Sequence, residues 1–108
     1  NDLPRPAMYQ AFHTIVPLQY SPTQPSTEVF DVVGPVCESG DWIGHDRALA
    51  VKAGDQLAVL SAGAYCMSMS SNYNSRPKAA EILVDGTNSH LIRQRDEFAD
   101  QIRGEKLL

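Results

Sequence analysis

The chain has 108 residues, of which 43% are hydrophobic and 20% are charged, and its formal net charge is −4. This length and composition predict one globular domain that is long enough to form a hydrophobic core. The nine Lys and Arg residues are scattered, which argues against nucleic acid or an anionic membrane as a partner. No apolar run approaches the roughly 18 residues of a membrane span, and the N-terminus does not resemble a secretory signal.

The first third of the chain is predicted to hold a short helix and two strands. A helical turn is expected at Pro6–Ala11, because proline is favoured at the first helical position. Strands are expected at Phe12–Gln19, where Pro17 marks an edge or a bulge, and at Thr27–Val33. The segment between them, Tyr20–Ser26, is rich in Ser, Pro and Thr and is expected to be a loop.

A thiol and a carboxylate follow the second strand. Gly34 and Pro35 break the strand pattern, so Cys37 and Glu38 are expected in a loop, the kind of place where a rigid sheet often presents catalytic groups. A packed thiol beside a solvated turn residue would give the same pattern, and the pair alone leaves both interpretations open. Cys37 and Cys66 have no metal-ligand spacing, and although the sequence permits a disulfide, both are expected to be thiols in a reducing cytoplasm, where the protein is therefore expected to be.

The middle of the chain is predicted to contain one further strand. Asp41–Asp46 is expected to begin a polar, irregular connection that leads through Arg47–Val51 to a turn. Gln56–Leu60 is a continuous apolar run of strand length, which is typical of a strand buried on both faces. After Gly63, the Ala and Met content favours one or two helical turns.

The last third is predicted to form a hairpin and a helix. Ala79–Val84 and Ser89–Gln94 are expected to pair across the turn at Asp85-Gly86. Arg95–Leu108 is expected to contain a C-terminal helix that is interrupted or ends near Gly104. The whole pattern predicts a mainly β fold, a small antiparallel, Greek-key-like barrel or sandwich with a short helix after Gly63 and a C-terminal helix.

Seven short motifs occur in the order seen in the C-terminal part of the diaminopimelate decarboxylases, which the chain therefore resembles over nearly all its length. These enzymes are pyridoxal-phosphate decarboxylases of the alanine-racemase-like fold type. The motifs are Arg5-Pro6-Ala7-Met8-Tyr9, Cys37-Glu38-Ser39-Gly40-Asp41, Gly54-Asp55, Ala62-Gly63-Ala64-Tyr65, Met69-Ser70-Ser71-Asn72-Tyr73-Asn74, Arg76-Pro77 and Leu91-Ile92-Arg93. Each motif is weak alone, but so many in register are specific.

The resemblance implies that residues 1–108 form a single C-terminal β domain of a larger two-domain enzyme. In the family, an N-terminal (β/α)8 barrel carries the lysine that binds pyridoxal 5′-phosphate covalently. The lysines of this chain, Lys52, Lys78 and Lys106, lie in no motif similar to that segment. The 108 residues alone are therefore expected to be inactive, and their partners are expected to be their own barrel domain and a second subunit.

The resemblance also implies roles for five residues. Such enzymes convert meso-2,6-diaminopimelate to L-lysine and CO2 in lysine biosynthesis. Cys37 matches the proton donor, and thiols surrender a proton close to neutral pH. Glu38 matches the contact to the distal ammonium of the substrate, and Arg5 and Tyr9 match the residues that hold its distal carboxylate. Tyr65 matches a tyrosine that reaches the cofactor and also the substrate. No metal ligand is implied.

Two further expectations concern how the site is assembled. Shared active sites in the family's homodimer imply that Cys37 and Glu38 act in the partner's site, whereas Arg5 and Tyr9 act within their own subunit. The loop Asn72–Asn74 is expected to position Tyr65. Two alternatives stay open: a related ornithine or arginine decarboxylase, which Arg5 disfavours because those substrates lack a distal carboxylate, and a non-catalytic β domain that serves only to dimerise or to bind a peptide.

Overall fold

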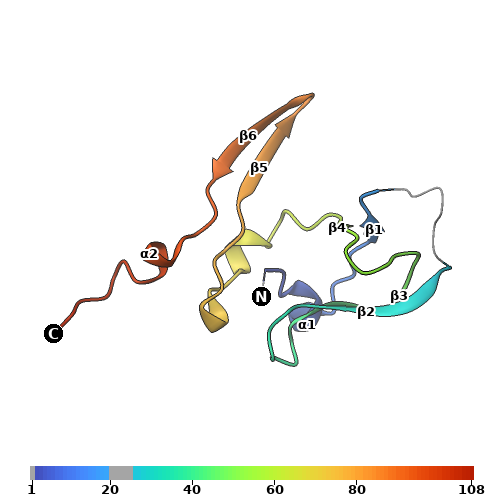
Figure 1. Ribbon diagram of the computed structural model, residues 1–108, viewed down its shortest axis with the longest axis horizontal. Coiled ribbons are helices and arrows are strands. Elements are labelled where there is room, and N and C mark those ends of the chain that lie inside the picture. Colours follow the sequence, from blue (N-terminus) through green and yellow to red (C-terminus); the bar gives the residue numbers. More distant parts are fainter. Residues whose placement is uncertain (1, 20–25) are drawn as a thin grey trace.

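The computed structural model describes residues 2–19 and 26–108, so most of the predicted loop Tyr20–Ser26 lies outside the described residues. Within these ranges the fold is mainly β, with three two-stranded antiparallel sheets and a few short helical segments (Figure 1). The elements in chain order are α1 Arg5–Tyr9, β1 Ile15–Pro17, β2 Glu28–Val33, β3 Trp42–Leu49, β4 Leu57–Val59, the 3₁₀ turns η1 Met67–Met69 and η2 Tyr73–Ser75, β5 Glu81–Asp85, β6 Asn88–Arg93 and α2 Phe98–Gln101.

Helix α1 confirms the predicted helical turn, although it lies one to two residues earlier in the chain. Pro6 lies in the first turn, where a backbone N–H would have no partner within the helix and its absence therefore costs little. The Pro6 side chain is fully buried. The helix ends at Gln10, whose backbone is left-handed (φ 54°) and whose N–H donates to the Arg5 carbonyl. Helix α1 packs against β3, and this contact fixes its position.

Strands β1 and β4 pair with each other, with Ile15 opposite Val59 and Pro17 opposite Leu57. The predicted strand Phe12–Gln19 is thus confirmed in its centre, and Pro17 ends it. The predicted burial of Gln56–Leu60 on both faces is wrong, because all three β4 residues are only half-buried. A strand with one partner in a two-stranded sheet lacks the covering layers that full burial requires.

Strands β2 and β3 form the longest sheet, and β3 corrects the prediction of an irregular connection at Asp41–Asp46. The polar His45 and Asp46 interrupt the apolar pattern by which a strand is recognised in a sequence. A two-stranded sheet leaves one face in water and tolerates polar residues there. Register shifts beside Val32 mark β-bulges, and Asp46 adopts a left-handed backbone (φ 53°).

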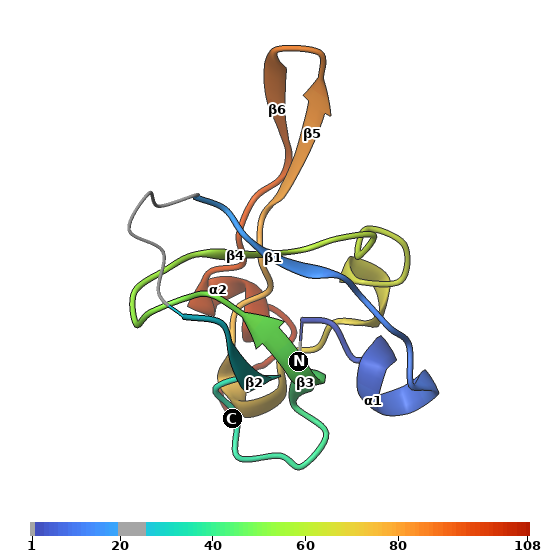
Figure 2. The same cartoon turned by 90° about the vertical axis from the view of Figure 1, so that its right-hand side faces the viewer.

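Strands β5 and β6 confirm the predicted hairpin, which projects from the rest of the chain in both views (Figures 1 and 2). Gly86 begins the two-residue turn with φ 60°, the left-handed conformation that such a hairpin turn requires of glycine. The expected helix after Gly63 takes the form of the 3₁₀ turns η1 and η2. The C-terminal helix is present as α2 but spans one turn, with Glu97 and Asp100 forming a capping box.

The hydrophobic core is small for a chain of this length. Its buried apolar side chains are Leu3, Pro6, Ile15 and Leu49, which lie around α1, β1 and β3. The radius of gyration is 16.3 Å, compared with about 13 Å for a compact domain of some 100 residues. The apolar residues of the β5–β6 hairpin are exposed instead, and they are Ile82, Leu83, Val84, Leu91 and Ile92. Because the three sheets do not close on one another, the predicted barrel or sandwich stays a prediction.

Candidate functional site

Cys37 and Glu38 lie in the connection between β2 and β3, residues 34–41, which we call the Cys loop. The Gly34 N–H donates to the Asp41 carbonyl at 2.6 Å and closes the base of the loop. The Asp41 carboxylate turns inward, where it is 8% exposed, and accepts the Val36 N–H at 3.0 Å. A charged acceptor inside the loop therefore fixes the backbone immediately before Cys37.

Gly34 is required at its position by a close approach. A Cβ atom built there would overlap the Asp41 carboxylate, so the loop can close only if this residue has no side chain. Gly40 is different, because a Cβ there would meet Ala7 at 3.7 Å, an ordinary van der Waals distance. The latter contact also shows that the Cys loop lies against α1.

The Cys37 and Glu38 side chains are both exposed on this loop. A Glu38 oxygen accepts the Gly40 N–H at 3.2 Å, which leaves the rest of the carboxylate available. The Cys37 sulfur accepts a hydrogen bond from the Asn74 amide, with 3.9 Å between Nδ2 and Sγ. No local sequence pattern indicated this contact, because the two residues are 37 positions apart.

Arg5, Tyr9 and Tyr65 form a second group, carried by α1 and by the turn before η1. The Arg5 guanidinium lies over the Tyr65 ring, 5.6 Å from its centroid, which is cation–π distance. Tyr9 and Tyr65 are 64% and 63% exposed, so much of each residue is accessible to a ligand. Tyr65 has a left-handed backbone (φ 63°), and non-glycine residues in this conformation cluster at functional sites.

The five predicted site residues thus fall into two neighbouring groups. Arg5 and Tyr65 are in direct contact, and Tyr9 is one helical turn from Arg5. Cys37 and Glu38 contact other residues, Asn74 and Gly40, although their loop lies against the same helix. The roles assigned to the five stay predictions.

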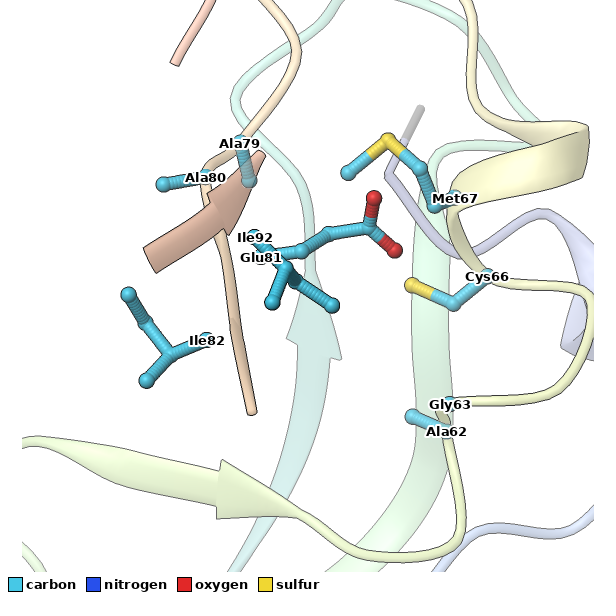
Figure 3. Close-up of a pocket in the computed structure, with 9 residues that line it drawn as sticks. All are labelled: Ala62, Gly63, Cys66, Met67, Ala79, Ala80, Glu81, Ile82 and Ile92. Carbon is cyan, nitrogen blue, oxygen red and sulfur yellow. The ribbon is translucent and has the colours of Figure 1, made fainter. Parts of the chain in front are cut away.

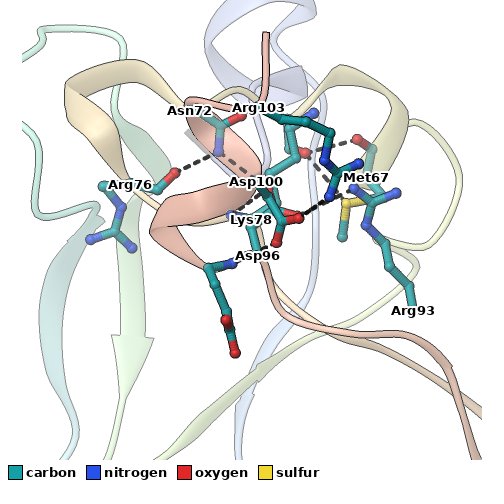
Figure 4. A network of polar contacts seen from close by, with 10 residues as sticks. Met67, Asn72, Arg76, Lys78, Arg93, Asp96, Asp100 and Arg103 are labelled. Atoms are coloured by element: carbon teal, nitrogen blue, oxygen red, sulfur yellow. Dashed lines mark hydrogen bonds and ion pairs between the residues drawn. The ribbon is translucent and has the colours of Figure 1, made fainter. Parts of the chain in front are cut away.

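A polar network joins the turn at η2 to the C-terminal segment (Figure 4). The Asn72 amide donates to the Arg76 carbonyl at 2.9 Å and to the Asp96 carboxylate at 3.2 Å. Asp96 also accepts the Lys78 N–H and lies 3.5 Å from Arg93. The Asn72 amide holds the pKa of Asp96 below its ordinary value; partial burial opposes this, while the Lys78 N–H and the Arg93 charge lower the pKa further. The network fixes the Asn72 end of the turn that carries Asn74.

An apolar pocket of about 320 Å³ lies at the base of the β5–β6 hairpin (Figure 3). Cys66 lines it and donates its S–H to the Asp2 carbonyl at 3.0 Å. Burial raises the pKa of the Cys66 thiol, and the charges of Asp2 and Glu81 raise it further. A protonated, hydrogen-bonded thiol agrees with a packing role for Cys66, and the pocket lining includes none of the five predicted site residues.

Two histidines have partners that sequence spacing could not reveal. His13 is buried, with Nδ1 3.1 Å from the Leu60 carbonyl. His45 lies on β3 with Nδ1 2.9 Å from the Asp31 carboxylate and its ring 4.3 Å from that of Trp42. The backbone N–H of Asp46, and then His45, lower the pKa of Asp31. These contacts support the β2–β3 sheet.

Three further observations concern the part of the chain that the structure describes. No group of three or more His, Cys, Asp or Glu side chains could hold a metal ion there. None of its helices is both long and apolar enough to span a bilayer. Both cysteines are free thiols.

The comparisons with known proteins agree with one another. Residues 1–63 match the family model described as pyridoxal-dependent decarboxylase, C-terminal sheet domain. Diaminopimelate decarboxylase of Vibrio cholerae is 54% identical over 92% of this chain and 23% of its own length, and that of Pseudomonas aeruginosa is 49% identical over 100% and 26%. The chain thus spans about a quarter of these relatives.

A solved structure extends the match beyond residue 63. Diaminopimelate decarboxylase of M. jannaschii in complex with L-lysine is 39% identical, with a TM-score of 0.89, and the match covers 99% of this chain and 24% of that one. The sheets, the turns at η1 and η2 and most of the C-terminal segment therefore follow the same path in both. The chain belongs to the pyridoxal-dependent decarboxylases, to the C-terminal sheet domain of that family.

Proposed function

We propose that this chain is the C-terminal domain of a diaminopimelate decarboxylase, which converts meso-2,6-diaminopimelate to L-lysine and CO2. The relatives that carry this name support the proposal, as does the identity of about 50% to them. The observation that carries it is the pairing of Arg5 with Tyr65, beside a Cys loop that lies against the helix of Arg5. The first group presents a cation and two phenols and the Cys loop presents a carboxylate and a thiol, which are the two sets of groups that a site shared between subunits requires of each chain.

The substrate has a carboxylate and an ammonium at the end that does not react. Arg5 suits the carboxylate because its planar guanidinium forms two parallel hydrogen bonds to such a group, and the exposed Tyr9 hydroxyl adds a third donor. Glu38 suits the ammonium, since a carboxylate forms a charge-assisted bond to it. Ornithine lacks the distal carboxylate, so it would leave the Arg5 charge without a partner.

Cys37 supplies the proton that replaces the lost carboxylate. When the C–C bond to CO2 breaks, its electron pair stays on the substrate carbon, and the proton of the Cys37 S–H passes to that carbon. The electron pair of the S–H bond stays on sulfur, so a thiolate remains. A pyridoxal group, when bound, would delocalise the electron pair that remains on this carbon.

The residues present fit a pyridoxal phosphate whose covalent lysine lies outside this sequence. Tyr65 is exposed and would offer its hydroxyl to the group, and the Arg5 guanidinium lies over its ring. Lys52 lies in a turn where its backbone N–H donates to Asp55, Lys78 donates its backbone N–H to Asp96, and Lys106 is in the exposed C-terminal tail, and none of the three lies in a motif similar to the family's cofactor-binding segment. The 108 residues alone would then bind no cofactor covalently and would be inactive.

A barrel domain and a second subunit complete the proposed enzyme. The exposed apolar side chains of the β5–β6 hairpin and the small core suggest that other strands or domains cover this chain, and a closed barrel or sandwich belongs to that assembly. The exposure of Cys37 on the Cys loop suits a group that reaches a partner's site. The free thiols suit a cytoplasmic location.

Subunit mixing tests the shared site in the complete enzyme. Cys37→Ala subunits are mixed with subunits that lack the covalent lysine, and dimer formation is checked by native mass spectrometry. A site shared between subunits restores about one quarter of the wild-type activity, since half of the dimers are mixed and each of them has one intact site. Mixed dimers without activity would show that each subunit uses its own Cys37.

Substrate preference tests the proposed function itself. The complete enzyme, loaded with pyridoxal phosphate, is assayed for CO2 release from meso-diaminopimelate, L-ornithine and L-arginine at equal concentrations. We expect a kcat/KM for meso-diaminopimelate at least about a hundredfold above the values for ornithine and arginine. Those two substrates have no distal carboxylate, so the Arg5 charge would stay unpaired when either of them binds. Equal or preferential turnover of ornithine would assign the chain to the alternative decarboxylases.

A further inference from the structure

We propose that Asn74 positions the Cys37 thiol and stabilises the thiolate that remains once Cys37 has given up its proton. This inference rests on the proposed function, in which Cys37 is the proton donor. It concerns a residue of the turn at η2 and not the five residues whose roles the family resemblance implies.

The contact between the two side chains has the polarity that this role requires. The Asn74 amide donates from Nδ2 to the Cys37 sulfur across 3.9 Å. A neutral sulfur is a weak acceptor, but a negatively charged one accepts a charge-assisted hydrogen bond. The bond therefore strengthens in the state that follows proton transfer, and an interaction of this kind lowers the barrier of the transfer itself.

The backbone around Asn74 is shaped to present its side chain. Asn74 and Ser75 both have left-handed backbones, with φ 57° each. Asparagine is one of the few residues other than glycine that adopt this conformation routinely. A rare conformation at two consecutive residues persists only where surrounding contacts hold it, so we infer that such contacts hold this turn in place.

Those surrounding contacts come from both sides of the turn. On one side, the Asn72 amide bridges the Arg76 carbonyl and the Asp96 carboxylate (Figure 4). On the other, the Gln101 side chain of α2 donates to the Ser75 carbonyl at 3.3 Å. The C-terminal segment thereby holds the turn, and the turn holds the amide against Cys37. The amide keeps both of its protons and only stabilises the negative charge on sulfur, so the proton that reaches the substrate carbon comes from Cys37.

The test measures the reactivity of Cys37 and needs no substrate. Iodoacetamide modification of Cys37 is followed by peptide mass spectrometry in the complete enzyme, and the rate at pH 7 is divided by the rate at pH 10. This ratio reports how readily the thiolate forms and cancels differences in access. Asn74→Gly keeps the left-handed backbone but removes the amide, and Asn74→Asp keeps the shape but offers only acceptor oxygens.

We expect the ratio to fall about fivefold in Asn74→Gly, and further in Asn74→Asp because a negative charge then faces the sulfur. The modification rate of Cys66 in the same samples checks that the fold is intact, and it should not change. A ratio equal to that of the wild type in Asn74→Gly, with Cys66 unchanged, would overturn the inference.

The outcome is separable from that of the proposed function. A lowered ratio in an enzyme that does not decarboxylate meso-diaminopimelate would establish the Asn74 contact and overturn the proposed function. An unchanged ratio in an enzyme that decarboxylates it would overturn the role of Asn74 alone.

Discussion

Replacement of Gly34 by alanine should disable the Cys loop, whereas the same replacement at Gly40 should not. At Gly34 the new Cβ overlaps the Asp41 carboxylate, which is buried and cannot turn aside without releasing the Val36 N–H. At Gly40 the new Cβ meets Ala7 at 3.7 Å, and no clash follows. Both variants restrict the unfolded chain equally, so the comparison isolates the effect on the folded loop.

The magnitude follows from the bond that Gly34→Ala must break. A hydrogen bond to a charged group contributes about 1.5 to 3 kcal/mol when its partner would otherwise be buried and unpaired. About 2 kcal/mol corresponds to a decrease of roughly thirtyfold in the population of the native loop. If Cys37 and Glu38 act only from that loop, kcat/KM should fall by a similar factor.

The assay is decarboxylation of meso-diaminopimelate by the complete enzyme, with thermal unfolding and cofactor absorbance as checks on folding. Gly34→Ala should lose about thirtyfold in kcat/KM, and Gly40→Ala should stay within about threefold of the wild type. Equal activity of the two variants would refute the argument that the Asp41 carboxylate sets the shape of the Cys loop.

Three other predictions follow from the same geometry. Arg5→Gln should raise KM for meso-diaminopimelate by about tenfold to a hundredfold with a smaller effect on kcat, because a charged pair is lost; an unchanged KM would place the distal carboxylate elsewhere. Since the Asn72 amide lowers the pKa of Asp96 in the folded chain, this carboxylate contributes stability above its unfolded pKa and loses it as the pH falls through its folded pKa. The Tm of Asp96→Asn should therefore fall less steeply than that of the wild type as the pH drops below about 4. The same dependence of Tm on pH in both proteins would contradict the network. Iodoacetamide should modify the exposed Cys37 faster than Cys66 at pH 7, because burial raises the pKa of the Cys66 thiol; faster reaction of Cys66 would count against its packing role.

Local sequence signals predicted the elements whose shape depends on near neighbours. Pro6 indicated α1, and Asp85-Gly86 indicated the β5–β6 turn, because both act within a few residues. Strand β3 was missed because His45 and Asp46 interrupt its apolar pattern, and only pairing with β2 makes it a strand. The C-terminal helix is shorter than expected, since no face of α2 is buried to stabilise further turns.

The candidate site shows the same division between local and distant information. Gly34 and Pro35 correctly predicted that Cys37 lies in a loop after a strand. The Arg5–Tyr65, Cys37–Asn74 and Asn72–Asp96 contacts join residues 24 to 60 positions apart, and no spacing rule connects such distances. The family resemblance indicated Arg5, Tyr65 and Cys37 and assigned the loop Asn72–Asn74 to Tyr65, which stays a prediction. The contacts of Asn74 with Cys37 and of Asn72 with Asp96 emerged only from the folded chain.

The proposed enzyme depends on Cys37 as its proton donor, and one substitution tests this role. The rate of L-lysine formation from meso-diaminopimelate is measured for the complete enzyme, for Cys37→Ala and for the matched Cys66→Ala, each loaded with pyridoxal phosphate. We predict a loss of at least about a hundredfold for Cys37→Ala, the usual contribution of a positioned general acid, and a nearly unchanged rate for Cys66→Ala. Undiminished L-lysine formation by Cys37→Ala would contradict the account.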